Sequence, residues 1–449
     1  MTGAKRPGRL LPVCPDRVRN RAIRLGGEVF WISLGQAAVA LGGLMGVRIL
    51  TELLPPTIYG ELALAMTVVA FAQMAIQQPL FEGSRRLFPA AAEAEQTAAF
   101  LEAMWHLALR VSVTLGGVGL VGLASLAAAR APAWLGLAAA TCAVTIISTW
   151  SMPISGILNA TRRRALIAGH EGAQQWLRFG VAAVLVWWIG PRSSVAMAGY
   201  AVAAALVLGS HGWFLRRMLP AGHAAARDAV VNDWKTRIVT YAWPFAAWGA
   251  ALAVQFASAR WALQMFDAPE SVGLFAALHH VGYYPVLLMV GVLSKFLSPV
   301  IFNRAGSGED AGRNRGARGL GKLLVASALG VTLIATAVAL LAYDLIFALL
   351  VAPEYRSVAW LLPLQVLGSG LFASSQAASV LPMVATNTAS LLKPKIFSAA
   401  LGTALNLLGA GLYGLPGVVW AGIVTGLVTF LWIAGVGGVL REPRTFRSE

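Results

Sequence analysis

Five basic side chains lie inside long apolar stretches of this sequence, where ionisable residues are rare. They are Arg48, Arg110, Arg178, Arg260 and Lys295. A guanidinium stays protonated, and its planar fork can donate two parallel hydrogen bonds to phosphate oxygens. Because charges within apolar segments usually face a polar interior, these five residues are candidates for an anion-binding path. Each could instead anchor its helix at a membrane interface or pair with an acid one turn away.

A second group of side chains could hydrogen-bond the hydroxyl groups of a ligand through amides and imidazoles. Its members are Gln73, Gln77, Gln255, His279 and His280. Polar residues between apolar helices often join helices instead, so both roles stay open. Asp344 lies in an apolar stretch without a nearby cation. It could pair with one of the arginines or carry a coupling proton, and a position near the membrane surface is equally compatible with the sequence.

The usual signatures of an enzyme do not stand out in this sequence. No spacing of nucleophile, histidine and carboxylate, and no metal-ligand spacing, can be picked out. The two cysteines, Cys14 and Cys142, lie in a basic leader and in an apolar stretch, which implies neither a disulfide framework nor a metal site. We therefore expect no catalytic activity and no cofactor.

The composition is that of an integral membrane protein. Of 449 residues, 58% are hydrophobic and 12% charged, and the mean hydropathy is +0.70. Soluble domains carry about 25% charged residues, so this composition excludes a soluble enzyme or a nucleic-acid-binding domain. The net charge of +16 is therefore to be explained by membrane topology rather than by binding to nucleic acid.

Windows of about 20 apolar residues, the length that crosses a bilayer as a helix, predict twelve spans. Because strand-like alternation is not sustained in any of them, we expect an all-α polytopic membrane protein. The expected spans are 29–50, 59–80, 104–128, 134–157, 175–190, 195–215, 239–265, 271–295, 322–350, 358–385, 395–413 and 416–440.

The distribution of Lys and Arg predicts the orientation. With a cytoplasmic N-terminus, 27 of the 35 basic residues fall in inside segments, three in outside loops and five within spans. Such a bias follows the positive-inside rule and supports an even number of spans. We expect a bacterial cytoplasmic (inner) membrane protein with both termini in the cytoplasm.

The two halves of the sequence resemble each other. In the segments that begin at Arg48 and at Arg260, an arginine precedes an acidic, proline-containing turn, and Gly60 or Gly273 follows 12 or 13 residues later. This predicts two six-helix lobes related by a parallel repeat. The predicted parts are a basic leader (1–28), a first lobe (29–215), a cytoplasmic linker (216–238), a second lobe (239–440) and a cytoplasmic tail (441–449).

The stretch from Arg48 to Gly60 has the form Arg-x-Leu-Thr-x-Leu-Leu-x-Pro-x-x-Tyr-Gly. It resembles the first-loop signature of the polysaccharide flippases related to the O-antigen translocases, within the multidrug, oligosaccharidyl-lipid and polysaccharide exporter superfamily. Pro353-Glu354-Tyr355 resembles the turn before span 10 of that family. The resemblance implies transfer of a polyprenyl-diphosphate-linked glycan from the inner to the outer leaflet of the lipid bilayer, by alternating access, for surface polysaccharide synthesis.

On this interpretation, the five buried cations would bind the diphosphate, and the amide and histidine group would contact sugars. Glycosyltransferases and a polymerase of the same pathway would be partners, and a proton or sodium gradient could drive transport. A cation-coupled multidrug exporter is the main alternative, although the excess of buried cations favours an anionic cargo. A peptidoglycan-precursor flippase usually has more spans, and a membrane glycosyltransferase or polymerase would need longer outer loops.

Overall fold

The computed structural model describes residues 15–161, 164–218, 227–305, 311–384 and 388–438, and these form helices and short connections without any strand. The helices are α1 (Pro15–Leu53), α2 (Pro56–Ala72), the π-helical η1 (Gln73–Gln77), α3 (Gln78–Glu93), α4 (Thr97–Ala128), α5 (Pro132–Ala160), α6 (Arg164–Ile189), α7 (Ser193–Met218), α8 (Asp228–Phe266), α9 (Pro269–Ala305), α10 (Ala311–Leu350), the 3₁₀-helical η2 (Pro353–Leu361), α11 (Leu362–Ala378), α12 (Val380–Val384), η3 (Thr388–Leu391) and α13 (Leu392–Val436). Within the described part of the chain, nine helical segments are long and apolar enough to cross a membrane. The predicted all-α, multi-pass architecture is therefore confirmed.

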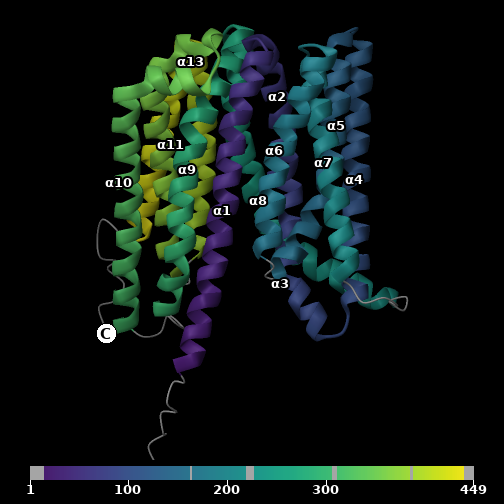
Figure 1. The fold of residues 1–449 in the computed structure, drawn as a ribbon, viewed down its shortest axis with the longest axis vertical. Coiled ribbons are helices and arrows are strands. Elements are labelled where there is room, and N and C mark those ends of the chain that lie inside the picture. Colours follow the sequence, from purple (N-terminus) through teal and green to yellow (C-terminus); the bar gives the residue numbers. More distant parts are fainter. Residues whose placement is uncertain (1–14, 162–163, 219–226, 306–310, 385–387, 439–449) are drawn as a thin grey trace, which may run out of the picture.

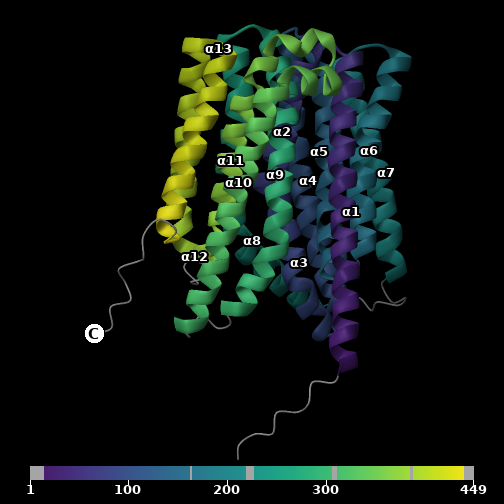
Figure 2. The same ribbon diagram turned by 60° about the vertical axis from the view of Figure 1, so that its left-hand side comes forward.

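The long helix α13 turns back on itself at Gly414, whose φ of 59° favours glycine. A Cβ on Gly409 would overlap the Gly417 carbonyl, whereas eight residues of straight helix would separate these positions by about 12 Å. The Asp267 carboxylate fixes the turn by accepting a hydrogen bond from the Leu415 amide at 3.0 Å. α13 thus makes two passes, as the sequence predicts. α6 and α8, which are not among the nine, run alongside the other helices (Figures 1 and 2).

The helices form two bundles. In the first lobe, α6 packs against α1 and α7, and α5 packs against α3, α4 and α7. In the second lobe, α11 packs against α9, α10 and α13, and α13 also packs along α8. Figure 1 shows α9, α10 and α11 on one side of α1 and α4, α5 and α7 on the other.

Helix α8 begins inside the segment predicted to be a linker. Of 216–238, residues 219–226 lie outside the described residues, but the helix starts at Asp228. Trp234 and Ile238 are buried in a cluster with Phe100 of α4, and the Trp234 indole donates to Gln96 at 2.9 Å. The start of α8 is thus bound to the first lobe, although its later turns pack along α13 in the second. Charged residues in its first turns lower the local hydropathy, so the hydropathy windows predict a span that begins only at residue 239.

The lobes touch closely at the end that carries the α1–α2 and α8–α9 turns, which the charge pattern predicts to be outside. We call this contact the outer seam. It comprises Pro56 and Gly60 of α2, Gly273 of α9, and the hydrogen bond between Tyr355 of η2 and Leu54 of α1. A Cβ on Gly273 would overlap the Pro56 carbonyl oxygen, and one on Gly60 would lie 3.0 Å from the Gly273 nitrogen. The Tyr355 hydroxyl of η2 donates to the Leu54 carbonyl of α1 at 2.6 Å.

The tight glycine contact at the seam leads to a structural prediction. Replacing Gly273 with valine would force the first turns of α2 and α9 apart, because the obstructing atom belongs to the backbone. Spin labels at Arg192 and Glu354, in a background lacking the native cysteines, should then report a longer distance than in the parent protein. Gly180→Val is the control, because a Cβ there meets nothing within 4 Å. An unchanged distance in Gly273→Val would contradict this description of the seam.

Candidate functional site

A central cavity of about 180 Å³ lies between the two lobes. The first lobe contributes residues of α2, η1, α6 and α7 to its wall, and the second lobe contributes residues of α8 and α9. Arg178 of α6 and Arg260 of α8 both line it, together with Gln73 and His280. Four of the residues singled out in the sequence thus meet at one place, although α6 and α8 belong to different lobes.

The two arginines are held by rings and weak carbonyl contacts. The Arg178 guanidinium lies 4.7 Å from the ring centre of Tyr200 and 4.8 Å from that of Phe179. Arg260 donates to the Phe256 carbonyl at 3.4 Å. The Nε atoms of both arginines are buried and have no hydrogen-bond partner among the described residues.

The charge of this cavity is not balanced by acids. Among the described residues that line it there is no aspartate or glutamate. An ionised group taken from water into a protein interior costs several kcal/mol unless it is paired. Two guanidiniums with free N–H donors in one cavity therefore form a site suited to an anion, above all to one with several oxygen atoms.

A neighbouring inner pocket extends this site between α1, α6 and α9. It has a volume of about 380 Å³ and shares Arg178, His280 and Tyr284 with the central cavity. Lys295 of α9 lies at its far end, four turns beyond His280, and much of the remaining wall is apolar. The His280 Nδ1 lies 3.1 Å from the Ala276 carbonyl, so it carries a proton, and the ring lines both spaces. Lys295, Arg178 and Arg260 thus line two neighbouring spaces that share part of their wall.

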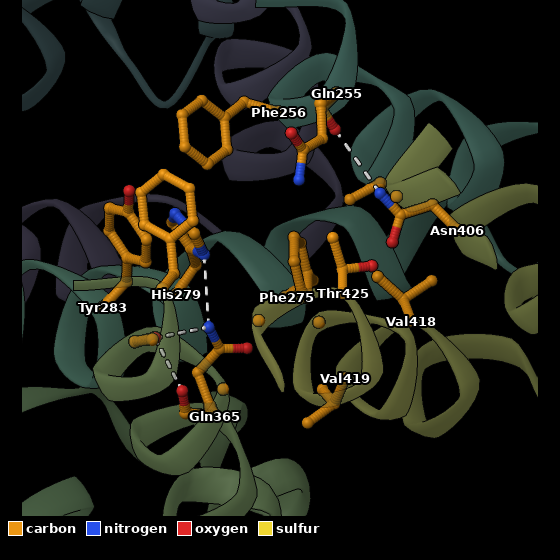
Figure 3. A pocket seen from close by; sticks show the side chains of 17 residues that line it. Gln255, Phe256, Phe275, His279, Tyr283, Gln365, Asn406, Val418, Val419 and Thr425 are labelled. Carbon is orange, nitrogen blue, oxygen red and sulfur yellow. Dashed lines mark hydrogen bonds between the residues drawn. The ribbon is translucent and has the colours of Figure 1, made fainter. Parts of the chain in front are cut away.

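A third space, the second-lobe pocket, is enclosed by α8, α9, α11 and α13 (Figure 3) and has a volume of about 80 Å³. It contains Gln255 and His279, two further residues of the predicted hydroxyl-binding group. Their side chains are therefore separated from those of Gln73 and His280, which line the central cavity.

Arg48, which the sequence placed among the candidates for the cationic path, does not line these three pockets. It forms an ion pair with Glu52 and donates to the carbonyls of Val351 and, at 3.5 Å, of Ala348. These acceptors belong to the last turn of α10 and the residue after it, where helix carbonyls lack partners. Arg48 thus joins α1 to α10 beside the outer seam, although Arg260 occupies the matching place in the repeat.

Three other predicted site residues also lie elsewhere. Gln77 is fully buried and donates to the Thr145 carbonyl at 2.9 Å and the Thr149 hydroxyl at 3.1 Å, so it joins η1 to α5 rather than facing a ligand. Arg110 is exposed on α4, and Asp344 is exposed near the end of α10. Neither residue lines the central cavity, the inner pocket or the second-lobe pocket.

Several residues of the site were not predicted. Tyr59, Tyr200 and Tyr284 line the central cavity, and Gln36 and Gln175 line the inner pocket. Helical spacing could have identified two of them, because Gln175 precedes Arg178 by three residues and Tyr284 follows His280 by four. The described residues contain no cluster of three or more His, Cys, Asp or Glu side chains that could hold a metal ion.

Comparison with known proteins shows the fold. No family model and no curated protein matches the sequence. Among solved structures, the lipid II flippase MurJ in an inward closed conformation is similar, with a TM-score of 0.66 and 11% identity over 91% of this chain and 87% of that one. An inward-facing multidrug resistance MATE family transporter of the MOP superfamily has a TM-score of 0.62 and 14% identity over 93% of this chain and 100% of that one. A MOP superfamily transporter from Pyrococcus furiosus, with a TM-score of 0.54, shares 14% identity over 92% and 94% of the two chains. The chain thus has the fold of MOP superfamily transporters.

The position of Arg48 predicts a role in stability at the outer seam rather than in anion binding at the central cavity. Arg48→Ala removes charge-assisted hydrogen bonds worth about 1.5–3 kcal/mol each when well formed, less for a partly exposed pair. We expect a lower unfolding temperature for the purified protein and unchanged binding of inorganic diphosphate by calorimetry. Arg178→Gln should show the opposite pattern. Loss of diphosphate binding in Arg48→Ala would return that residue to the anion path.

Proposed function

We propose that this protein is a flippase that carries a polyprenyl-diphosphate-linked oligosaccharide from the inner to the outer leaflet of the bacterial cytoplasmic membrane. The observation that carries the proposal is the pair Arg178 and Arg260, whose buried Nε atoms have no partner among the described residues and which line one cavity from opposite lobes without an acid among its described lining residues. Such a cavity would lower the barrier to moving a diphosphate through hydrocarbon, which is otherwise very high.

The charge of the proposed cargo matches that of the cavity. A phosphodiester carries one negative charge, so a diphosphate bonded to a sugar and a lipid presents about two. The two guanidiniums supply the same number of positive charges, and each can bind phosphate oxygens through two N–H groups. Lys295 in the inner pocket offers a first contact on the way to Arg178.

The inner pocket also suits a lipid tail. Its wall combines apolar side chains such as Val39, Leu44 and Leu288 with the cations Arg178 and Lys295. An amphiphile could lie there with its head group at Arg178 and its chain between α1 and α9. A soluble cargo would not need an apolar wall beside a cationic one.

Alternating access gives the two arginines a role in the transport cycle. Arg178 is on α6 and Arg260 on α8, so an anion held by both links the lobes. The bound anion also removes the repulsion between two like charges in a low-dielectric space. The loaded protein is therefore better able than the empty one to pass through states in which the cavity is closed to water. We extend the proposal to a proton or sodium gradient as the energy source, and to the glycosyltransferases and polymerase of the same pathway as partners.

Two other cargoes suit transporters of this fold. MATE family neighbours make a multidrug exporter the main alternative, but an organic cation would be repelled by Arg178 and Arg260. The likeness to the lipid II flippase MurJ favours a diphosphate-linked lipid and leaves a peptidoglycan precursor as the competing glycan. Comparing lipid carriers with different sugars would discriminate between the two.

Flipping in reconstituted vesicles tests the arginines directly. Arg178→Gln and Arg260→Gln should each slow transfer of a fluorescent polyprenyl-diphosphate sugar by roughly ten- to a hundred-fold, because each loses a charge-assisted contact worth about 1.5–3 kcal/mol. Arg178→Lys should retain part of the activity. Arg110→Gln, which removes an exposed cation outside the described pockets, is the matched control. Full activity in both glutamine variants would refute the proposed anion site, and repeating the assay with imposed proton or sodium gradients would identify the driving ion.

The cellular consequence provides an independent measurement. Deleting the gene should abolish a surface polysaccharide and trap its lipid-linked unit on the inner leaflet, detected by a membrane-impermeant sugar label. A normal surface glycan combined with increased drug sensitivity would instead support the exporter.

A further inference from the structure

The second-lobe pocket is neutral and polar, unlike the cationic central cavity beside it. Figure 3 shows its side chains converging from α8, α9, α11 and α13. The polar residues of its wall are Gln255, His279, Gln365, Ser369, Asn406 and Thr425. All carry amide, hydroxyl or imidazole groups, which can donate and accept hydrogen bonds. A ligand of this pocket would therefore be rich in hydroxyl or amide groups and would need no charge.

Much of this polar wall is held in place by its own hydrogen bonds. The Gln365 amide donates to the Ser369 hydroxyl at 3.2 Å and lies 3.4 Å from the His279 ring nitrogen. On the opposite side, the Asn406 amide donates to the Ser258 hydroxyl at 2.9 Å. Groups fixed in this way present their remaining donors and acceptors without further ordering, which favours binding.

Two polar groups remain for a ligand. The Thr425 hydroxyl is buried without a hydrogen-bond partner among the described residues, and the residue is only 4% exposed. The side-chain amide of Gln255 points into the pocket (Figure 3). Asn406 donates to the backbone carbonyl of Gln255 and not to this side chain. An unpaired buried hydroxyl is costly, so these groups indicate a space made for a polar occupant.

Aromatic rings complete the wall. The ring of Tyr283 is stacked on that of His279 at 4.4 Å. The ring of Phe256 meets those of Tyr283 and Phe372 edge-on, each at 5.7 Å. Flat apolar rings beside amides and hydroxyls suit a sugar, which has C–H faces and a rim of hydroxyl groups. The volume of 80 Å³ corresponds to about three waters at about 30 Å³ each, which the hydroxyl-bearing edge of a sugar could replace.

Phe256 connects this pocket to the anion site. Phe256 lines both the second-lobe pocket and the central cavity, so it lies between the two spaces. Its carbonyl accepts the hydrogen bond from Arg260, one helical turn away, or about 5 Å along α8. A sugar bonded directly to a diphosphate at Arg260 is therefore within reach of the second-lobe pocket.

We propose that the second-lobe pocket is a sugar subsite that receives the first, uncharged sugar of the cargo and discriminates glycosylated from bare carrier lipid. Gln255 and Thr425 would bind its hydroxyl groups, and Phe256 would separate the subsite from the cavity until the cargo enters. This inference rests on the proposed function.

Gly422 provides a way to fill the subsite. It lines the pocket on the same face of α13 as Val418 and Thr425, and a Cβ there would meet nothing within 4 Å. Gly422→Leu should occupy the space without moving the backbone, and Gly422→Ala is the matched control. The probes are polyprenyl diphosphate and the same lipid bearing one N-acetylhexosamine, bound to purified protein in lipid nanodiscs. We expect the parent protein and Gly422→Ala to bind the glycosylated lipid about tenfold more tightly, as two or three neutral hydrogen bonds allow.

In Gly422→Leu this preference should disappear, with binding of bare polyprenyl diphosphate unchanged. Thr425→Val, which removes only the unpaired hydroxyl and keeps the shape, should reduce the preference without affecting the bare lipid. Equal affinity of the parent protein for both lipids, or an equal loss for both lipids in Gly422→Leu, would overturn the sugar subsite while leaving the anion site intact. Failure of the parent protein to bind either lipid would overturn the proposed function together with the subsite.

Discussion

Two arginines with buried, unpaired Nε atoms line one cavity that has no acid among its described lining residues, and this is the constraint on which the rest of the structure depends. Uncompensated charge in a protein interior costs several kcal/mol, and Arg178 and Arg260 recover only part of this from rings and a carbonyl. The fold must therefore be stable enough elsewhere to hold them there. A bound anion would remove that cost, which is the physical basis of the selectivity that we propose.

The outer seam supplies part of that stability and explains why two matching arginines act differently. Both Arg48 and Arg260 precede the turn of their repeat, but only Arg48 lies beside the free carbonyls at the end of α10. There it completes a helix end and closes the contact between the lobes. Arg260 has no such helix end beside it and is left with its charge in the cavity. The same position of the predicted repeat thus joins the lobes in one half and, in the other, provides a cation for the proposed anion site.

Features that depend on local composition could be predicted from the sequence, whereas features that depend on packing in three dimensions could not. Hydropathy predicted twelve helical passes, because a membrane span depends on local composition, and even the reversal at Gly414 falls between two predicted spans. The meeting of Arg178 and Arg260 could not be derived, because it depends on how α6 and α8 pack in three dimensions. Gln77 shows the limit most clearly: it lies one turn from Gln73, yet a change of helical face turns it toward Thr145 instead of the cavity.

Helix α8 links these features into one mechanical unit. Its first turns are bound to the first lobe through Trp234, and its later turns, which carry Gln255 and Arg260, pack against α13. The later turns also contact the first lobe, because the Trp261 indole donates to the Thr67 hydroxyl of α2 at 2.8 Å. Between Trp234 and Gln255 lie Pro244, which leaves a backbone carbonyl without its helical partner, and Gly249, where a Cβ would overlap the Met74 carbonyl of the π-helix η1. Pro244 is a place where a helix bends, so the helix that carries Arg260 could also accommodate the movement of one lobe against the other that the proposed transport needs.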